Sequence, residues 1–438
     1  MSIIANDDYT LANLYRDNEA RLDSLFKIYS EIYDLPHYLH TDSDIVPEAF
    51  EYAKKRKYFV ILVLHTKDGH ICFQRSFDTG HLSMNLPGAS IILEEEDTIV
   101  TAVKRVARES FTNARVADIA PIISLTNRFI CQSGEEFEHH GLGVRALLLN
   151  RIQDIEDLSK DKLYKGKFLQ EFPVEEIPHP PAQETYSIFA KWFSSKRYTT
   201  YTNEIETQHE VLERYILHQK CINPCMKILS KVFGDYSVKN VKEKIAEKIS
   251  NVDKAIDIAC GDDRGIFDLL NQAKLFVAND IAVDQIRNMH SQYSSLYPKL
   301  PKSSTLLFTN HDCLDLPFKE KAFDVAICQN ILHHMNTADD LQELLRNLDR
   351  IASRILIVEI QDPNTENALG RLRHKYYIDF LKDEGKHFYV REDFEKILNR
   401  HFKNRKVEFE YMQTIRGSYM FAEILSRCVP EIAVKEEV

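Results

Sequence analysis

The stretch from Asp257 to Asp280 constrains the fold of this chain more than any other part of the sequence. It opens with an apolar run around Ile256 and Ile258, which is typical of a buried strand, breaks at Gly261, and continues with apolar residues at helical spacing. A second apolar run ends at Asp280. An acid about 20 residues after a glycine turn is placed to accept hydrogen bonds from a ribose diol. The stretch therefore predicts a nucleoside-binding strand–helix–strand unit.

The turn after the first strand distinguishes two classes of nucleoside. A dinucleotide site needs glycines, because the pyrophosphate lies against the helix N-terminus. Here the turn carries Asp262 and Asp263, whose charges would repel a pyrophosphate but attract the sulfonium and ammonium groups of S-adenosylmethionine (SAM). The stretch resembles motif I of the class I SAM-dependent methyltransferases, with Asp257 and Gly261 at matching positions and Ala259 where a glycine is common.

Later segments resemble the same family in the same order. In the first of them, Asp312 stands where the family has an acid that accepts a hydrogen bond from the adenine amine. The matching segments are 310–318, 323–335 and 354–359, followed by two runs, 407–412 and 419–425, that predict an antiparallel edge hairpin. The resemblance implies an α/β protein whose C-terminal half contains a Rossmann-like seven-stranded methyltransferase sheet.

The resemblance also implies which residues form the site. The expected cofactor-binding residues are Asp257, Ala259, Gly261, Asp280, Ile281, Asp312, Cys313 and Gln329. Methyl transfer from a sulfonium is an in-line displacement, so the protein supplies positioning, desolvation and, for a protonated acceptor, a base. The candidates for that base are His333, His334 and His387, and no metal site is predicted.

The N-terminal part carries a second pattern. Runs at 58–64 and 70–76 predict a hairpin. The segment Leu86-Pro87-Gly88, an acidic run at 94–97 and a helix at 98–111 follow. This order resembles a Nudix domain, which implies an α/β/α sandwich. In that family, carboxylates on the helix hold the divalent metals that activate water against a diphosphate.

The predicted helix departs from the catalytic pattern of that family. Arg105 and Glu109 match it, whereas Val106 and Ser110 stand where it has acids. A single carboxylate does not clamp Mg²⁺ ions against a diphosphate. We therefore expect the N-terminal domain to recognise a substrate or a partner without hydrolysing diphosphates, and we expect SAM binding to be independent of residues 1–195.

Breaks in the pattern give the expected domains. They are a Nudix-like domain with an N-terminal helix (1–195), a linker and helical lead-in (196–250), the methyltransferase domain (251–428) and a tail (429–438). The net charge of −11 argues against extensive nonspecific nucleic-acid binding, which needs basic surface. No signal segment and no membrane-length apolar run is found, so a cytoplasmic protein without a membrane partner is expected.

Three functions stay open from the sequence. The first is a SAM-dependent methyltransferase that acts on a small-molecule or nucleotide-like acceptor. The second is a bifunctional Nudix diphosphohydrolase and methyltransferase, which Mg²⁺-dependent release of phosphate would favour. The third is a non-catalytic SAM-binding scaffold protein, which SAM binding without turnover would favour.

Overall fold

The computed structural model describes the chain in segments. They are residues 18–66, 68–78, 81–91, 99–111, 113–151, 163–169, 172–195, 237–261, 272–281, 305–362, 387–414 and 417–426, with residues 269, 286, 289, 364, 366, 368, 371, 372 and 375. The described residues form two compact units, one drawn from 1–208, 261–264 and 278–319, the other from 209–260, 265–277 and 320–438. The predicted acidic run, Asp262, Asp263, the helical lead-in up to 236 and the tail lie outside the described residues. The predicted domain boundaries stay a prediction.

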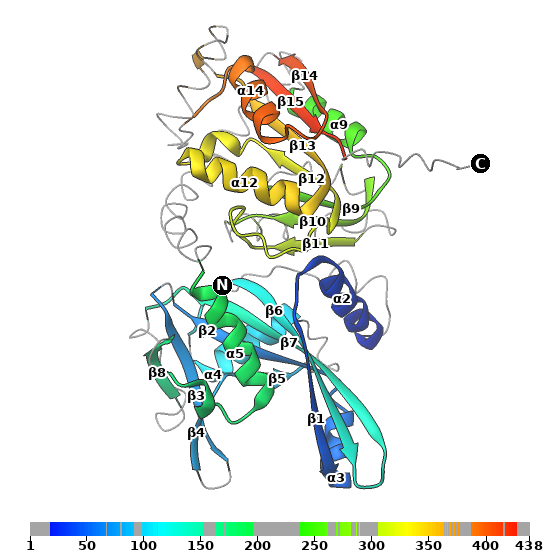
Figure 1. The fold of residues 1–438 in the computed structure, drawn as a ribbon, viewed down its shortest axis with the longest axis vertical. Coiled ribbons are helices and arrows are strands. Elements are labelled where there is room, and N and C mark those ends of the chain that lie inside the picture. Colours follow the sequence, from blue (N-terminus) through cyan, green and yellow to red (C-terminus); the bar gives the residue numbers. More distant parts are fainter. Residues whose placement is uncertain are drawn as a thin grey trace, which may run out of the picture. The chain divides into compact units, whose positions relative to one another are not determined.

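The N-terminal sheet is mixed and has eight strands within the described segments, in the order β1-β6-β7-β2-β3-β4, with β5 beside β2 and β8 beside β3 (Figure 1). Its strands are β1 (His37–Ile45), β2 (Tyr58–His65), β3 (His70–Asp78), β4 (His81–Asn85), β5 (Gly88–Ser90), β6 (Val116–Cys131), β7 (Glu136–Leu148) and β8 (Leu163–Phe168). The predicted hairpin is confirmed, because β2 and β3 pair antiparallel. The pairs β1–β6 and β2–β7 are parallel.

Helices cover both faces of this sheet. They are α2 (Asn18–Ile32), α3 (Pro47–Lys54), α4 (Ile99–Ser110) and α5 (Pro180–Phe193), with a short 3-10 turn at Val174–Glu176. On one face, Val63 of β2 shares a core with Phe189 of α5. On the other, Tyr58 of β2 packs against Phe26 of α2 with ring centroids 5.2 Å apart. Alternate residues of a strand face opposite ways, so the sheet is covered on both sides. The predicted helix at 98–111 is confirmed as α4.

The C-terminal sheet has seven strands in the order β11-β10-β9-β12-β13-β15-β14. They are β9 (Val252–Ile258), β10 (Ala273–Asn279), β11 (Thr305–Thr309), β12 (Phe323–Gln329), β13 (Ala352–Ile360), β14 (Val407–Thr414) and β15 (Gly417–Ile424). β12 pairs in parallel with β9 and β13, and β15 runs antiparallel between β13 and β14. The predicted Rossmann-like sheet and its edge hairpin are confirmed.

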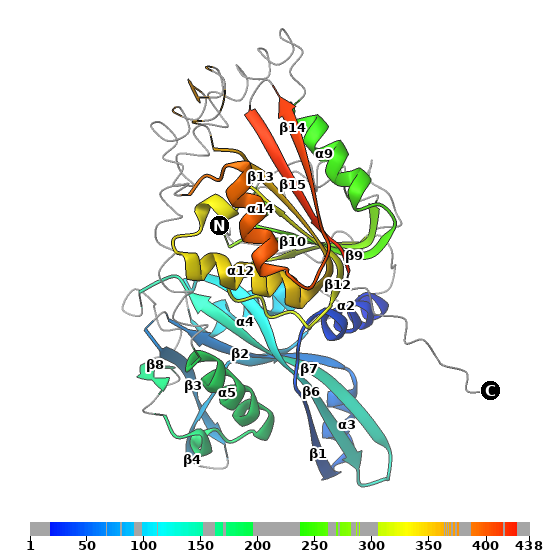
Figure 2. The ribbon, with the colours of Figure 1, turned by 45° about the horizontal axis from the view of Figure 1, so that its top comes forward.

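Helices also lie on both faces of the C-terminal sheet. The described ones with full bounds are α9 (Ser237–Lys248), α12 (Ala338–Ile351) and α14 (Arg391–His401). Along β14, Glu410 pairs with Lys244 of α9, whereas its neighbour Phe409 packs edge-on against Phe394 of α14. Figure 2 shows α9 and α14 on opposite sides of the β14–β15 hairpin. No described helix is long and apolar enough to cross a membrane.

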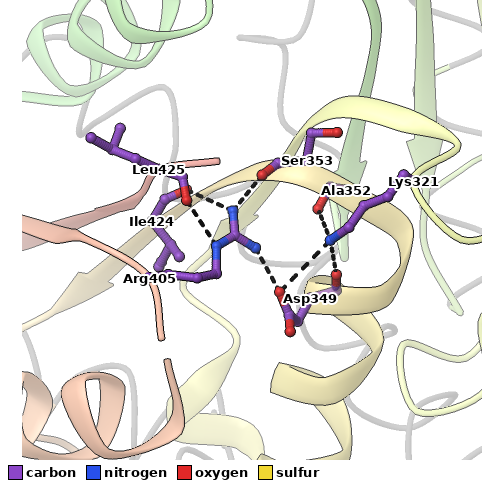
Figure 3. A network of polar contacts seen from close by, with 7 residues as sticks. All are labelled: Lys321, Asp349, Ala352, Ser353, Arg405, Ile424 and Leu425. Carbon is purple, nitrogen blue, oxygen red and sulfur yellow. Dashed lines mark hydrogen bonds and ion pairs between the residues drawn. The ribbon is translucent and has the colours of Figure 1, made fainter. Parts of the chain in front are cut away.

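A buried arginine joins elements at the amino edge of the parallel strands (Figure 3). The Arg405 side chain is 2% exposed, and its guanidinium donates to the Asp349 carboxylate at 2.6 Å and to the carbonyl of Leu425 at 2.8 Å. The other residues of this network are Lys321, Ala352, Ser353 and Ile424. Because a buried cation is costly unless it is paired, this set of acceptors holds the start of β13 to the end of β15.

Candidate functional site

The chain turns sharply at the carboxyl end of β9. Asp257, the last residue but one of β9, is 8% exposed. Ala259 has a φ of 55° and Gly261 a φ of 62°, so both take the left-handed backbone conformation. A glycine adopts this conformation freely, whereas an alanine does so at a cost of about 1 kcal/mol or more. Such a strained non-glycine residue is more common at functional sites than elsewhere.

Asp280 lies directly after β10 and is 7% exposed. Its Oδ2 accepts a hydrogen bond from the Gly261 amide at 2.8 Å. The next residue, Ile281, is half-buried, and its carbonyl accepts from the Asn310 side-chain amide at 2.8 Å. The Asp280 carboxylate is therefore buried and held at the end of the strand, next to the turn that follows β9.

Asn279 anchors the loop that follows β11. It is 1% exposed, and its Oδ1 accepts from the His311 amide at 3.0 Å and from the Thr309 hydroxyl at 2.9 Å. Its Nδ2 donates to the His311 carbonyl at 2.9 Å. The sequence pattern does not mark this residue, although an asparagine directly before the strand-end acid is a signal that could have found it.

Asp312 lies in this loop and is 2% exposed. Its Oδ1 accepts from the Leu314 amide at 2.8 Å, and its carbonyl accepts from the Asp315 amide at 3.0 Å. Cys313, between them, is half-buried. An aspartate that bonds the backbone two residues on forms a tight turn, so the loop's own backbone orients the Asp312 carboxylate.

The carboxyl end of β12 presents two amides. Gln329 is its last residue and is half-buried. Asn330 has a φ of 53°, and its backbone amide donates to the Val358 carbonyl at 2.8 Å. The Asn330 Oδ1 atom is buried and accepts no hydrogen bond from the described residues. A buried acceptor without a donor is costly, so this atom is suited to receive a donor from a ligand.

His333, in the 3-10 turn Leu332–His334 after β12, forms a buried pair that sequence patterns do not predict. It is 4% exposed, and its Nδ1 lies 2.6 Å from Oε1 of Glu359, which is fully buried. Glu359, near the end of β13, also accepts from the amides of Leu332 and Ile360, each at 2.9 Å. A carboxylate at Nδ1 favours the proton on that nitrogen, which makes Nε2 the basic nitrogen of His333.

The other two candidate histidines lie beside His333 in different environments. His334 is half-buried, with its ring centroid 4.2 Å from that of His333. His387 is exposed, and its backbone amide donates to the His333 carbonyl at 3.2 Å. Phe388 stacks on the His333 ring at 4.8 Å and 19°. The three predicted histidines are therefore brought together, and within this cluster the bond to Glu359 distinguishes His333.

Burial also fixes the protonation of two nearby groups. It raises the pKa of Tyr389 to about 12, with a smaller contribution from Glu359. Burial likewise raises the pKa of the Cys328 thiol, with smaller contributions from Glu359 and Asp257. Both groups stay protonated near pH 7, so neither supplies a base or a thiolate there.

Helix α4 of the N-terminal sheet does not gather carboxylates. Val106 is 2% exposed, and Ser110 is 5% exposed and accepts a hydrogen bond from Gln74. Glu109 is exposed and pairs with Arg105 at 3.3 Å, a surface ion pair one helical turn apart. Within the described segments, no group of three or more His, Cys, Asp or Glu side chains is placed to hold a metal ion.

Comparisons with known proteins find similar solved structures and one matching family model. The YcgJ protein of Bacillus subtilis is 10% identical; the match covers 43% of this chain and 99% of that chain, with a TM-score of 0.34. The N-methyltransferase NodS of Bradyrhizobium japonicum, in complex with S-adenosyl-L-homocysteine, is 13% identical, with 43% of this chain and 88% of that chain covered and a TM-score of 0.33. An S-adenosylmethionine-dependent methyltransferase of Clostridium acetobutylicum is 14% identical, with 47% of this chain and 99% of that chain covered and a TM-score of 0.34. No curated protein is significantly similar in sequence. Residues 256–354 match the methyltransferase domain family. The C-terminal part of the chain therefore carries a SAM-dependent methyltransferase domain.

Proposed function

We propose that this domain binds SAM at the carboxyl edge of β9–β12 and methylates a small-molecule or nucleotide-like acceptor. The observation that carries the proposal is the buried Asp280 carboxylate, held by the Gly261 amide at the end of β10. A strand-end acid at this position accepts hydrogen bonds from ribose hydroxyls. Asp257 adds a second buried acid at the same edge, and carboxylates attract a ligand with two cationic groups.

The remaining cofactor residues have distinct proposed roles. Asp312, oriented by the Leu314 amide, accepts from the adenine amine, and Cys313 flanks the base. The left-handed backbone at Ala259 and Gly261 lets the cofactor approach the turn closely. The other contacts come from Ile281 beside the ribose and from Gln329 at the end of β12. The buried Oδ1 of Asn330 accepts a donor from the cofactor or the acceptor.

His333 is the proposed general base. When bound, SAM supplies an activated methyl group on its sulfonium. Glu359 holds the proton of His333 on Nδ1, so Nε2 can accept the proton that the acceptor loses. The buried ring, stacked on Phe388, keeps water away from that nitrogen. His334 and His387 lie beside His333 and are proposed to contact the acceptor.

The N-terminal domain is proposed to be a Nudix-like module that recognises the acceptor or a partner. Val106 and Ser110 are buried and Glu109 is paired with Arg105, which leaves α4 without a set of carboxylates for a divalent metal. A domain that keeps the fold but lacks the metal ligands could still bind an acceptor and raise its local concentration near the methyltransferase domain.

Two measurements test the proposed activity. Calorimetry with S-adenosyl-L-homocysteine (SAH) measures cofactor binding to the full chain, and mass spectrometry of cell extract incubated with the protein and methyl-labelled SAM identifies labelled products. Binding together with a labelled product supports the proposal. SAH binding without any labelled product would instead favour the scaffold, and absence of binding would contradict both.

The bifunctional alternative makes a separate prediction. If the N-terminal domain hydrolysed diphosphates, Mg²⁺ would stimulate release of phosphate or a monophosphate from a nucleoside diphosphate derivative, and Glu109→Gln would abolish it. We expect no Mg²⁺-dependent cleavage above background with either protein. The matched control is Glu138→Gln, which removes an exposed carboxylate that pairs with Arg128 on the same sheet at 2.9 Å.

A further inference from the structure

The loop that follows β11 belongs to the same compact unit as the N-terminal region, since residues 278–319 are grouped with residues 1–208. This loop contains Asp312, the proposed adenine contact. Residues on both sides of Asp312, His311 before it and Asp315 three positions after it, contact side chains from the N-terminal part of the chain. The N-terminal residues involved are Tyr33, Arg145 and Trp192.

On the first side, His311 bonds to Tyr33. The Tyr33 hydroxyl lies 2.9 Å from Nε2 of His311, and both residues are 1% exposed. The Tyr33 ring also packs on Phe318 with centroids 5.1 Å apart. Backbone bonds continue the contact, because Lys319 donates to the Ile32 carbonyl at 2.8 Å. The segment after α2 therefore lies along residues 317–319 as a short antiparallel bridge.

On the other side, Asp315 is held by a cation and an indole. Asp315 is 5% exposed; its Oδ2 accepts from the Trp192 indole at 3.1 Å and lies 3.8 Å from Nη1 of Arg145. Arg145 is 2% exposed, and its guanidinium lies 3.6 Å from the centroid of the Trp192 ring. Buried charges need such partners, so Asp315 and Arg145 fix each other's position.

We infer that Tyr33, Arg145 and Trp192 are positioning residues for the cofactor: they hold the loop that presents Asp312, so the N-terminal region sets the affinity of the methyltransferase domain for SAM. This inference rests on the proposed function. It reverses the expectation that SAM binding is independent of residues 1–195. It also gives the two parts of the chain a physical link, since a ligand that moved Trp192 or Tyr33 would change the cofactor site.

The chain offers a built-in reporter for the test, because Trp192 is its only tryptophan. SAH titrated into the full-length protein should change the tryptophan emission, with a midpoint equal to the dissociation constant from calorimetry. Binding seen by calorimetry with no change in emission at saturation would count against the coupling.

Conservative variants then measure the size of the effect. Tyr33→Phe removes only the hydroxyl and should weaken SAH binding about three- to tenfold, the value of one neutral hydrogen bond. Trp192→Phe removes the indole donor to the Asp315 carboxylate and shrinks the ring that contacts Arg145, so it should weaken SAH binding about tenfold. Asp315→Asn removes a charged partner and should weaken it about tenfold or more. The turnover rate at saturating SAM should not change, because none of these residues contacts the reacting atoms.

The control is Arg128→Gln, which breaks an exposed ion pair between β6 and β7 and should leave SAH affinity unchanged. If Tyr33→Phe, Trp192→Phe and Asp315→Asn all keep wild-type affinity and melting temperature while Asp280→Ala loses affinity, the inference is wrong and the proposed cofactor site survives. If Asp280→Ala has no effect either, or the wild type does not bind SAH, the proposed function fails and the inference fails with it.

Discussion

The two edges of the C-terminal sheet both bury charged side chains, but they use them differently. At the amino edge, Arg405 is surrounded by a carboxylate and backbone carbonyls that belong to the fold. At the carboxyl edge, Ala259 and Asn330 take left-handed backbone conformations in the turns that follow their strands, and the Asn330 Oδ1 has no donor among the described residues. A closed network contributes stability. Left-handed turns beside a buried acceptor that lacks a donor among the described residues are, in contrast, suited to bind a ligand.

The largest expected effect is at His333 on the carboxyl edge. His333→Gln should lower turnover of the methyl acceptor by about 10²- to 10⁴-fold at saturating SAM, the usual contribution of a general base. Steady-state assay of the labelled product measures it. The comparison variant, His334→Gln, keeps the bond between His333 and Glu359; because His334 is proposed only to contact the acceptor, it should raise the KM for the acceptor more than it lowers the turnover number. Equal losses in the two variants would argue that neither histidine is the base.

The amino edge predicts a loss of stability without a loss of binding. Arg405→Met should destabilise the domain by about 3 kcal/mol, because it leaves the partners of a buried cation unpaired. Denaturant unfolding measures this, and Arg346→Ala, which removes an exposed pair with Glu343, should cost less than about 1 kcal/mol. A folded Arg405→Met protein that no longer binds SAH would break the division between the two edges.

The opposite result, a loss of binding without a loss of stability, is expected at Asp280. Asp280→Ala should weaken SAH binding about tenfold to several hundredfold through lost charge-assisted hydrogen bonds to the ribose. Calorimetry measures it, with Asp253→Asn as the control, since that exposed acid at the start of β9 pairs only at the surface with Lys274 at 2.7 Å. An unchanged affinity in Asp280→Ala would remove Asp280 from the cofactor site.

The last comparison is with the N-terminal sheet, where the half-buried His139 affects the pH dependence of stability rather than ligand binding. Burial lowers the pKa of His139 from 6.5 to about 4, and a hydrogen bond to the Tyr58 backbone opposes this shift with a smaller contribution. Between pH 6.5 and 4, His139 is therefore protonated in the unfolded chain but neutral in the folded chain. The free energy of unfolding falls as the pH is lowered through this range, by at most about 1.4 kcal/mol per pH unit.

The check is the difference between wild type and His139→Gln. Thermal unfolding at pH 7 and pH 5 should show a smaller loss of stability on acidification in the variant, because its residue 139 does not titrate. Burial also lowers the pKa of His140, so part of the pH dependence should remain in the variant. Identical pH dependence in the two proteins would mean that His139 is more accessible to water than its packing against Phe59 indicates.

Much of the C-terminal fold could be predicted because its signals are local. Apolar runs of strand length, a glycine turn and a strand-end acid each occur within a short stretch of sequence. The spacing alone therefore predicts β9, β10 and the position of Asp280. The same holds for the helix α4 and the hairpin β2–β3. The strand β1 and the helix α3 were not predicted, because the alternation in His37–Ile45 is formed largely by polar residues.

The partners of the site residues are a different matter, since only the folded chain brings them together. Glu359 reaches His333 from the next strand of the sheet, Asn279 reaches His311 across two strand ends, and Trp192 reaches Asp315 over a separation of 123 residues. Hydrogen bonds between side chains carry no periodicity in the sequence, and their existence depends on sheet order and loop path. The sequence by itself therefore determined which groups could do chemistry, while the tertiary structure decided which of them are buried, oriented and paired, because desolvation and distance act only between residues that the fold has placed in contact.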